Sequence, residues 1–119
     1  MPHTPQDVHK KLLGKSGEAQ AVAYLKKKGY TIVKQNYKTP FGEADIVAKH
    51  KDELVFVEVK TRACLAFGSP KEAVTRQKQA RYYKIAQYYG LQSGEEPNAR
   101  FDVIEVFEDG EIVHIENAF

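Results

Sequence analysis

Two neighbouring stretches of the sequence have the pattern of β-strands and carry acids among apolar residues. In Leu54–Lys60 the valines at 55, 57 and 59 alternate with the other residues in a period of two, so Glu58 and Lys60 project from the same face. The shorter run Ala44–Ala48 is apolar apart from Asp45. A polar stretch between the two runs suits the turn of a β-hairpin. The sequence therefore predicts a hairpin with charged side chains in strands that otherwise suit a core.

The position of the turn decides whether the two acids meet. If the turn centres on Lys51-Asp52, Asp45 lies directly opposite Glu58, with Cβ atoms about 4.5–5.5 Å apart. Two carboxylates at that separation repel each other. Lys60, a bound cation, or a proton that raises one pKa must offset the repulsion. A register slip of one residue would turn Asp45 to the other face, so the prediction depends on the turn.

The convergent carboxylates predict a site for a divalent metal. Asp45 and Glu58 offer the hard oxygen ligands that Mg²⁺ takes together with waters and substrate phosphates. Lys60 would neutralise the negative charge that develops on phosphate oxygens. This composition is typical of a site that hydrolyses phosphodiester bonds with Mg²⁺ or Mn²⁺. The alternative is an ordinary cross-strand ion pair, worth at most about 1 kcal/mol.

Glu18 is a third candidate acid. In the predicted helix Gly17–Lys28 it lies in the same stripe as the apolar residues Ala21, Val22 and Leu25. Its carboxylate is therefore either aimed into a site or placed to complement the helix dipole in the first turn. The sequence leaves both readings open.

Turn and cap signals give the rest of the chain the order α-β-β-β-α-β-β. Residues 1–14 are predicted as a flexible polar tail and residues 15–119 as a single domain. Ser69-Pro70-Lys71-Glu72 has the pattern of a capping box, and Gly90 is predicted to end the helix that follows. The predicted elements are the helices Gly17–Lys28 and Pro70–Tyr89 and the strands Tyr30–Tyr37, Ala44–Ala48, Leu54–Lys60, Phe101–Phe107 and Glu111–Ile115.

Charge is unevenly distributed along the chain, although the net charge is only +2. Residues 60–94 contain seven Lys or Arg and one acid, whereas residues 95–119 contain eight acids and one Arg. Such asymmetry predicts a basic face for a polyanion such as DNA. The alternative is a charged helix surface that is merely solvated. The candidate nucleic-acid contacts are Arg62, Arg76, Lys78 and Arg81.

The composition also excludes several classes of protein. No apolar run approaches the roughly 20 residues of a membrane span, and the N-terminal sequence lacks the apolar core of a signal peptide. We therefore expect a cytoplasmic protein without a membrane partner. The single cysteine excludes an internal disulfide and a cysteine-based zinc site.

Three further polar residues are interpreted as structural. Asp102 can pair with Arg100 on the same face of its predicted strand. His50, in the predicted hairpin turn, and His114, in the predicted final strand, have no partners at metal-ligand spacing, so surface or edge positions are expected.

The candidate site residues resemble those of a known superfamily. Glu18, Asp45 and Glu58-Val59-Lys60, in the order helix, strand, strand, resemble the PD-(D/E)xK nucleases, which include type II restriction enzymes and archaeal Holliday junction resolvases. More closely, residues 14–119 resemble the YraN family of small bacterial proteins. The matching stretches are Gly17-Glu18-Ala19, Ala23-Tyr24-Leu25, Gly29-Tyr30, Asn36-Tyr37, Gly42–Val47, Phe56–Arg62, Lys78, Arg100–Val103 and Asn117-Ala118-Phe119.

This resemblance implies a restriction-endonuclease-like α/β fold with a central mixed β-sheet flanked by helices. It carries over Glu18, Asp45, Glu58 and Lys60 as site residues and Lys78 as support for a phosphate or metal. Ala44 stands where the superfamily has a proline that is not a ligand.

The resemblance also implies a function. The expected activity is metal-dependent cleavage of DNA, branched DNA included, and a homodimer is expected by analogy because cutting both strands needs two copies. The alternatives are a nucleic-acid-binding module without turnover, or an interaction partner in DNA uptake or repair. A binding module keeps the fold and the basic face but commonly loses one of the site residues, and this chain has them all.

Overall fold

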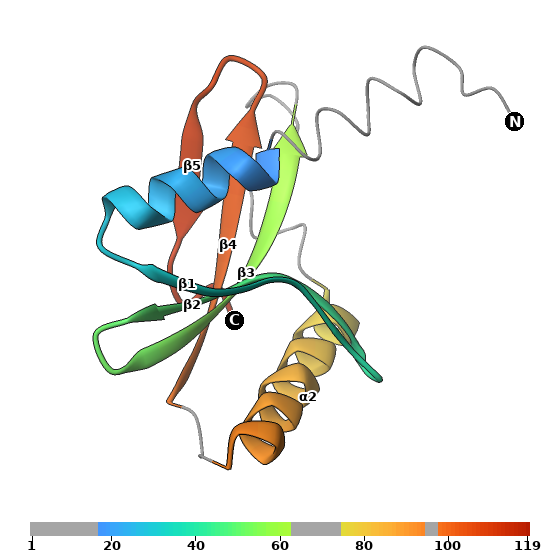
Figure 1. Ribbon diagram of the computed structural model, residues 1–119. Coiled ribbons are helices and arrows are strands. Elements are labelled where there is room, and N and C mark those ends of the chain that lie inside the picture. Colours follow the sequence, from blue (N-terminus) through green and yellow to red (C-terminus); the bar gives the residue numbers. More distant parts are fainter. Residues whose placement is uncertain (1–16, 63–74, 95–97) are drawn as a thin grey trace, which may run out of the picture.

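The computed structural model describes residues 17–62, 75–94 and 98–119. Five strands form one sheet in the order β1-β2-β3-β4-β5, with one helix before β1 and another between β3 and β4 (Figure 1). The predicted N-terminal tail and the predicted capping box at Ser69–Glu72 lie outside the described residues. The elements are a first helix of residues 17–27, then β1 (Thr31–Thr39), β2 (Gly42–His50), β3 (Glu53–Arg62), α2 (Arg76–Ser93), β4 (Ala99–Phe107) and β5 (Ile112–Ile115).

The sheet is mixed. Strands β1, β2 and β3 form an antiparallel meander, β3 pairs with β4 in parallel, and β4 pairs with β5 in antiparallel. A parallel pair needs a crossover, and α2 supplies it. The predicted order α-β-β-β-α-β-β and the central mixed sheet flanked by helices are thus confirmed.

The two helices cover opposite faces of the sheet, because successive strand residues point to opposite sides. Ile46 and Val57 pack with the first helix, whereas Val47 and Phe56 pack with α2. The first helix contributes Ala21, Val22 and Leu25 to its core, and α2 contributes Tyr82, Ile85 and Ala86 to the other. Glu58 and Lys60 share the parity of Phe56 along β3, so their side chains face α2.

The second helix ends later than its sequence predicts. Thr75 caps its N-terminus, where Oγ1 accepts a hydrogen bond from Lys78 N at 3.2 Å. The predicted stop at Gly90 is wrong, because the helix continues to Ser93. Gly94 has φ 76° and donates its N–H to Gly90 O at 3.0 Å, which is the left-handed C-terminal cap. Two glycines four residues apart offered two possible ends, and the helix uses the second.

A buried ion network ties β5 and Tyr30, the residue directly before β1, to β4. Arg100 Nε and Nη2 donate to the two oxygens of Asp102 at 3.0 and 2.8 Å, which confirms the predicted pairing. His114 Nε2 lies 2.7 Å from Asp102 Oδ2, and Asn117 N donates to Oδ1 at 3.1 Å. Burial raises the pKa of Asp102, but these bonds outweigh it and the net pKa is lowered. Arg100 Nη2 also donates to Tyr30 Oη.

His114 lies in β5 at the edge of the sheet, as expected, but its side chain is covered. Its side chain is only 2% exposed, because the rings of Tyr24 and Tyr30 lie against it at centroid distances of 5.5 and 6.1 Å. His50 is the last residue of β2, beside the predicted turn, and its ring stacks on Tyr30 at 4.1 Å.

Neither of the described helices is long and apolar enough to cross a membrane.

Candidate active site

The β2–β3 register brings the predicted acids together. The ladder runs from His50↔Glu53 to Ile46↔Val57, which is the register that the Lys51-Asp52 turn predicts. Beyond Ile46 the backbone ladder stops, and Asp45 Oδ2 accepts the N–H of Val59 at 2.8 Å. The carboxylate of Asp45 therefore replaces a strand partner and is held against β3, one residue from Glu58.

Asp45 lies among other acids and is partly buried. Burial raises the pKa of Asp45 to about 6, and the hydrogen bond from Val59 offsets only part of this. The negative charges of Glu58, Glu18 and Glu43 raise the pKa further. The structure thus brings all three predicted acids into one electrostatic field, and that field favours either a proton or a cation.

Replacing Asp45 by asparagine is expected to stabilise the metal-free protein at high pH. An acid whose pKa is raised on folding loses stability as the pH rises from its unfolded pKa to its folded pKa. A shift from 3.8 to about 6, discounted for partial exposure, corresponds to about 1–3 kcal/mol. The amide oxygen of the introduced asparagine can still accept the N–H of Val59, but the side chain carries no charge. Urea unfolding in EDTA should therefore show Asp45→Asn more stable by this amount at pH 8 and equal at pH 4.

The control for this measurement is Asp52→Asn, which changes an exposed acid in the β2–β3 turn. It should leave the pH dependence unchanged. A loss of several kcal/mol in Asp45→Asn at pH 8 would show instead that Asp45 is a structural hydrogen-bond centre.

Two lysines converge on Glu58. Lys78 Nζ on α2 lies 2.6 Å from Glu58 Oε1, and Lys60 Nζ lies 3.5 Å from the same oxygen. The hydrogen bond with Lys78 lowers the pKa of Lys60, and burial lowers it further. Burial also lowers the pKa of Lys78, but its hydrogen bond to Glu58 outweighs this and the net pKa is raised. Lys78 is therefore the firmer partner of Glu58.

Glu18 reaches the site from the first helix. Gly17 allows the helix to approach β3 closely, since a Cβ at that position would clash with Thr61 Cγ2. Asn36, in β1, lies between the acids: with its amide nitrogen turned towards them, it donates to Glu18 Oε2 at 3.2 Å and to Glu43 Oε1 at 3.1 Å. Glu18 thus lies near enough to Asp45 for its charge to raise the pKa of that carboxyl, and its role in a site stays a prediction.

Asn36, Glu43 and Tyr82 lie beside the predicted acids, and the sequence did not point to them. Asn36 has φ 51°, a left-handed conformation that asparagine tolerates better than most residues, inside a predicted strand. The hydroxyl of Tyr82 is buried beside Glu58 and the backbone of Asp45, without a hydrogen bond of ordinary length to any described residue. Burial raises its pKa, and the charges of Glu58 and Asp45 raise it further. One signal was available, because Tyr82 follows Lys78 by four residues and so shares its helix face.

The four predicted nucleic-acid contacts differ in their surroundings. Arg62 Nε is engaged with the buried Glu105 at 2.9 Å. Lys78 is bound to Glu58, whereas Arg76 and Arg81 are exposed on α2. Arg76 and Arg81 are thus the more available cations, and the role of all four in DNA binding stays a prediction.

The donor set fits Mg²⁺ or Mn²⁺ only as a two-carboxylate site. Within residues 17–62, 75–94 and 98–119, no three His, Cys, Asp or Glu side chains are arranged to hold a metal ion. Mg²⁺ does not require such a cage, because it typically keeps several waters and takes one or two carboxylates. Asp45 and Glu58 supply that number of carboxylates.

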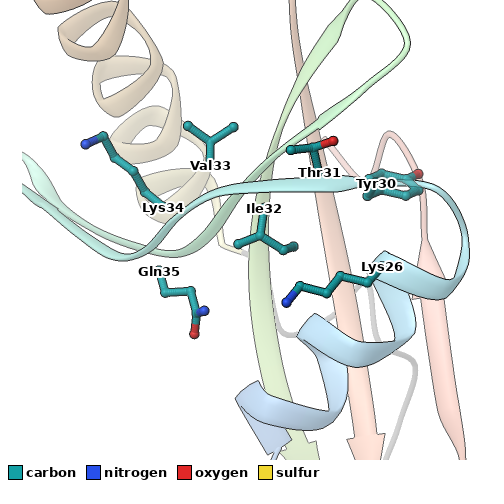
Figure 2. Close-up of a pocket in the computed structure, with 7 residues that line it drawn as sticks. All are labelled: Lys26, Tyr30, Thr31, Ile32, Val33, Lys34 and Gln35. Carbon is teal, nitrogen blue, oxygen red and sulfur yellow. The ribbon is translucent and has the colours of Figure 1, made fainter.

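A separate depression lies between the first helix and β1. Its volume is about 640 Å³, and Figure 2 shows Lys26 reaching below the strand towards Ile32 and Gln35, while Lys34 points away on the other side. Its lining contains none of the predicted site residues. The depression is therefore separate from the candidate site at the end of the β2–β3 ladder.

Comparisons with known proteins identify the family. Residues 17–106 match the family described as "Uncharacterised protein family UPF0102". A UPF0102 protein of Caldanaerobacter subterraneus subsp. tengcongensis is 46% identical over 94% of this chain and 98% of its own length. One of Thermodesulfovibrio yellowstonii is 48% identical over 90% and 95%.

A solved structure shows a more distant likeness. The structure of Pyrococcus furiosus SfsA in complex with Ca²⁺ has a TM-score of 0.35 and 15% identity, covering 90% of this chain and 63% of that chain, which is too distant to bear on function. The family match and the sequence relatives determine the family of this chain, and they agree with the resemblance to YraN. The chain belongs to the UPF0102 family.

Proposed function

We propose that this chain is a Mg²⁺- or Mn²⁺-dependent nuclease that hydrolyses phosphodiester bonds of DNA, within the PD-(D/E)xK superfamily. One observation carries the proposal: Asp45, Glu58 and Lys60 converge where the β2–β3 ladder ends. Acids in this position are costly to the fold, as the raised pKa of Asp45 indicates, and such a cost is typical of functional sites.

Each residue of the site has a distinct role in this proposal. Asp45 and Glu58 would hold the metal, and Glu18 would add negative charge from the first helix. A bound metal would polarise the scissile phosphate and lower the pKa of a bound water. The ammonium of Lys60 would bind the phosphate oxygens on which charge develops.

Lys78 has a supporting role that follows from the two distances. Because Lys78 is closer to Glu58 than Lys60 is, at 2.6 against 3.5 Å, Lys60 can turn to a phosphate without leaving Glu58 unpaired. Lys78 thus keeps Glu58 in place while Lys60 serves the substrate.

Metal binding is the first test of the proposal. Mn²⁺ should bind wild type and raise its melting temperature by mass action. Asp45→Asn should weaken Mn²⁺ binding by about 10- to 100-fold or more, since even residues that only support metal ligands have effects of that size. Calorimetric titration measures this, with Asp52→Asn as the exposed control. Equal affinity of wild type and Asp45→Asn for Mn²⁺ would exclude the site.

The second candidate is a nucleic-acid-binding module without catalysis. The observation that favours it is the engagement of Glu58 Oε1 by two ammonium groups, which also suits a purely structural ion cluster. Such a module would bind DNA through the cations of α2, with affinity that falls steeply as salt rises. Binding by wild type with no cleavage in Mg²⁺ or Mn²⁺ would favour it.

A further inference from the structure

The tip of the β1–β2 hairpin presents an aromatic ring in a fixed position. Phe41 is 45% exposed. Its N–H donates to Thr39 Oγ1 at 3.1 Å, and the Thr39 hydroxyl donates to Gly42 O at 2.7 Å. The turn is thus held by its own hydrogen bonds. A ligand that binds the exposed ring would therefore not have to order the backbone.

The hairpin tip rests on α2, beside which it lies in Figure 1. The side chain of Arg81 runs against Gly42, where a Cβ would come within 2.5 Å of Arg81 Cδ. Lys84 Nζ lies 5.7 Å from the centroid of the Phe41 ring, and the Tyr88 ring meets Phe41 edge to face at 6.3 Å. An exposed ring with two cations beside it is therefore anchored to the helix that also carries Lys78.

The ring lies within a few nucleotides of the candidate active site. Phe41 lies directly before β2 and precedes Asp45 by four residues, which corresponds to about 13 Å of extended chain. A nucleic-acid strand advances about 3.4 Å per nucleotide when its bases are stacked. A strand whose phosphate occupies the site beside Lys60 would thus place about its third or fourth neighbouring base near Phe41.

We propose that Phe41 stacks on an unpaired base while Arg81 and Lys84 bind the adjacent phosphates, so that the protein prefers DNA with unpaired nucleotides close to the cleavage position. The position of the cut rests on the proposed nuclease function, but the stacking does not. Stacking on aromatic rings in a basic surface is the usual way to bind single strands. A single exposed ring is too small for a protein partner, since stable protein interfaces bury more than about 1,000 Å².

The test measures binding in EDTA, where the proposed metal-dependent cleavage cannot occur. Two probes are compared by fluorescence anisotropy: a fully paired duplex, and the same duplex with a three-nucleotide flap that contains 2-aminopurine. Wild type should bind the flapped DNA more tightly and quench the 2-aminopurine. Phe41→Ala should lose about tenfold in affinity for the flapped DNA and little for the duplex.

Two further variants sharpen the result. Phe41→Tyr keeps a stacking ring and should retain the quench and the preference. Leu91→Ala removes an apolar side chain that is 84% exposed near the far end of α2, and it should bind both probes as wild type does. Unchanged melting temperatures would show that each variant is folded.

The proposal is overturned if wild type does not distinguish the two probes. It is equally overturned if Phe41→Ala keeps the preference, or loses the same affinity for both DNAs. A wild type that quenches the flap but never cleaves DNA with Mg²⁺ or Mn²⁺ would refute the nuclease function and leave the stacking site standing.

Discussion

Replacing Lys60 by alanine should lower the rate of DNA cleavage by about 10²- to 10³-fold while DNA and metal binding survive. The ammonium of Lys60 lies 3.5 Å from Glu58, beside the carboxylates but not among the proposed metal ligands. Its loss removes the charge that stabilises the pentavalent phosphate. Lys78 remains on Glu58, so the carboxylate is still paired and the fold is expected to hold.

Single-turnover cleavage of linear, flapped and four-way-junction DNA in Mn²⁺ measures this effect. Wild type, Lys60→Ala and Glu58→Gln are prepared identically, so that a contaminating nuclease would give all of them the same activity. Lys27→Ala removes an exposed lysine of the first helix and should cleave like wild type. Equal cleavage by wild type and both site variants would contradict the assignment, and so would binding without cleavage by wild type.

Replacing Asp102 by alanine should destabilise the protein by about 3–5 kcal/mol. Asp102 is 0% exposed and accepts hydrogen bonds from Arg100 and Asn117, with His114 also within hydrogen-bond distance. Its removal leaves the buried guanidinium of Arg100 with only Glu53 at 3.2 Å as an acidic partner among the described residues. Because a domain of this size has a stability of about 5–15 kcal/mol, the loss is a large part of the total.

Urea unfolding at pH 7 measures the loss, and Asp52→Ala in the exposed turn is the control. The lowered pKa of Asp102 fixes the sign of the pH dependence: its contribution is present above its unfolded pKa and lost as pH falls through the folded pKa. The difference between Asp102→Ala and wild type should therefore shrink in strong acid. A change below about 1 kcal/mol at pH 7 would contradict a structural role.

The acidic half of the candidate site was predictable because it depends on local geometry. A period of two in Leu54–Lys60 and a turn at Lys51-Asp52 suffice to fix the β2–β3 register. The same pattern could not show that the backbone ladder stops at Ile46 and that Asp45 takes the N–H of Val59 instead. The carboxylate can take the place of a backbone partner only where the two strands diverge, and that point is a property of the whole sheet.

The residues that were missed or misplaced depend on distant parts of the chain. His114 is buried by Tyr24 and Tyr30, which precede it by more than 80 residues. The second helix continues beyond Gly90, and the adjacent Tyr89 packs against Tyr37 of β1 and Phe56 of β3. Periodicity and caps describe neighbours in the sequence, and they carry no information about such contacts.

The parallel pairing of β3 with β4 has a consequence for the order in which the molecule assembles. In every β3–β4 pair, as in Leu54 with Ala99, the residue numbers differ by 45. Contacts that close long loops form slowly, whereas the β1–β2–β3 meander joins near neighbours. Asp45 and Glu58 would thus meet early in folding with Lys60 of the same hairpin as their nearby cation, and Lys78 would join them only when the crossover through α2 forms.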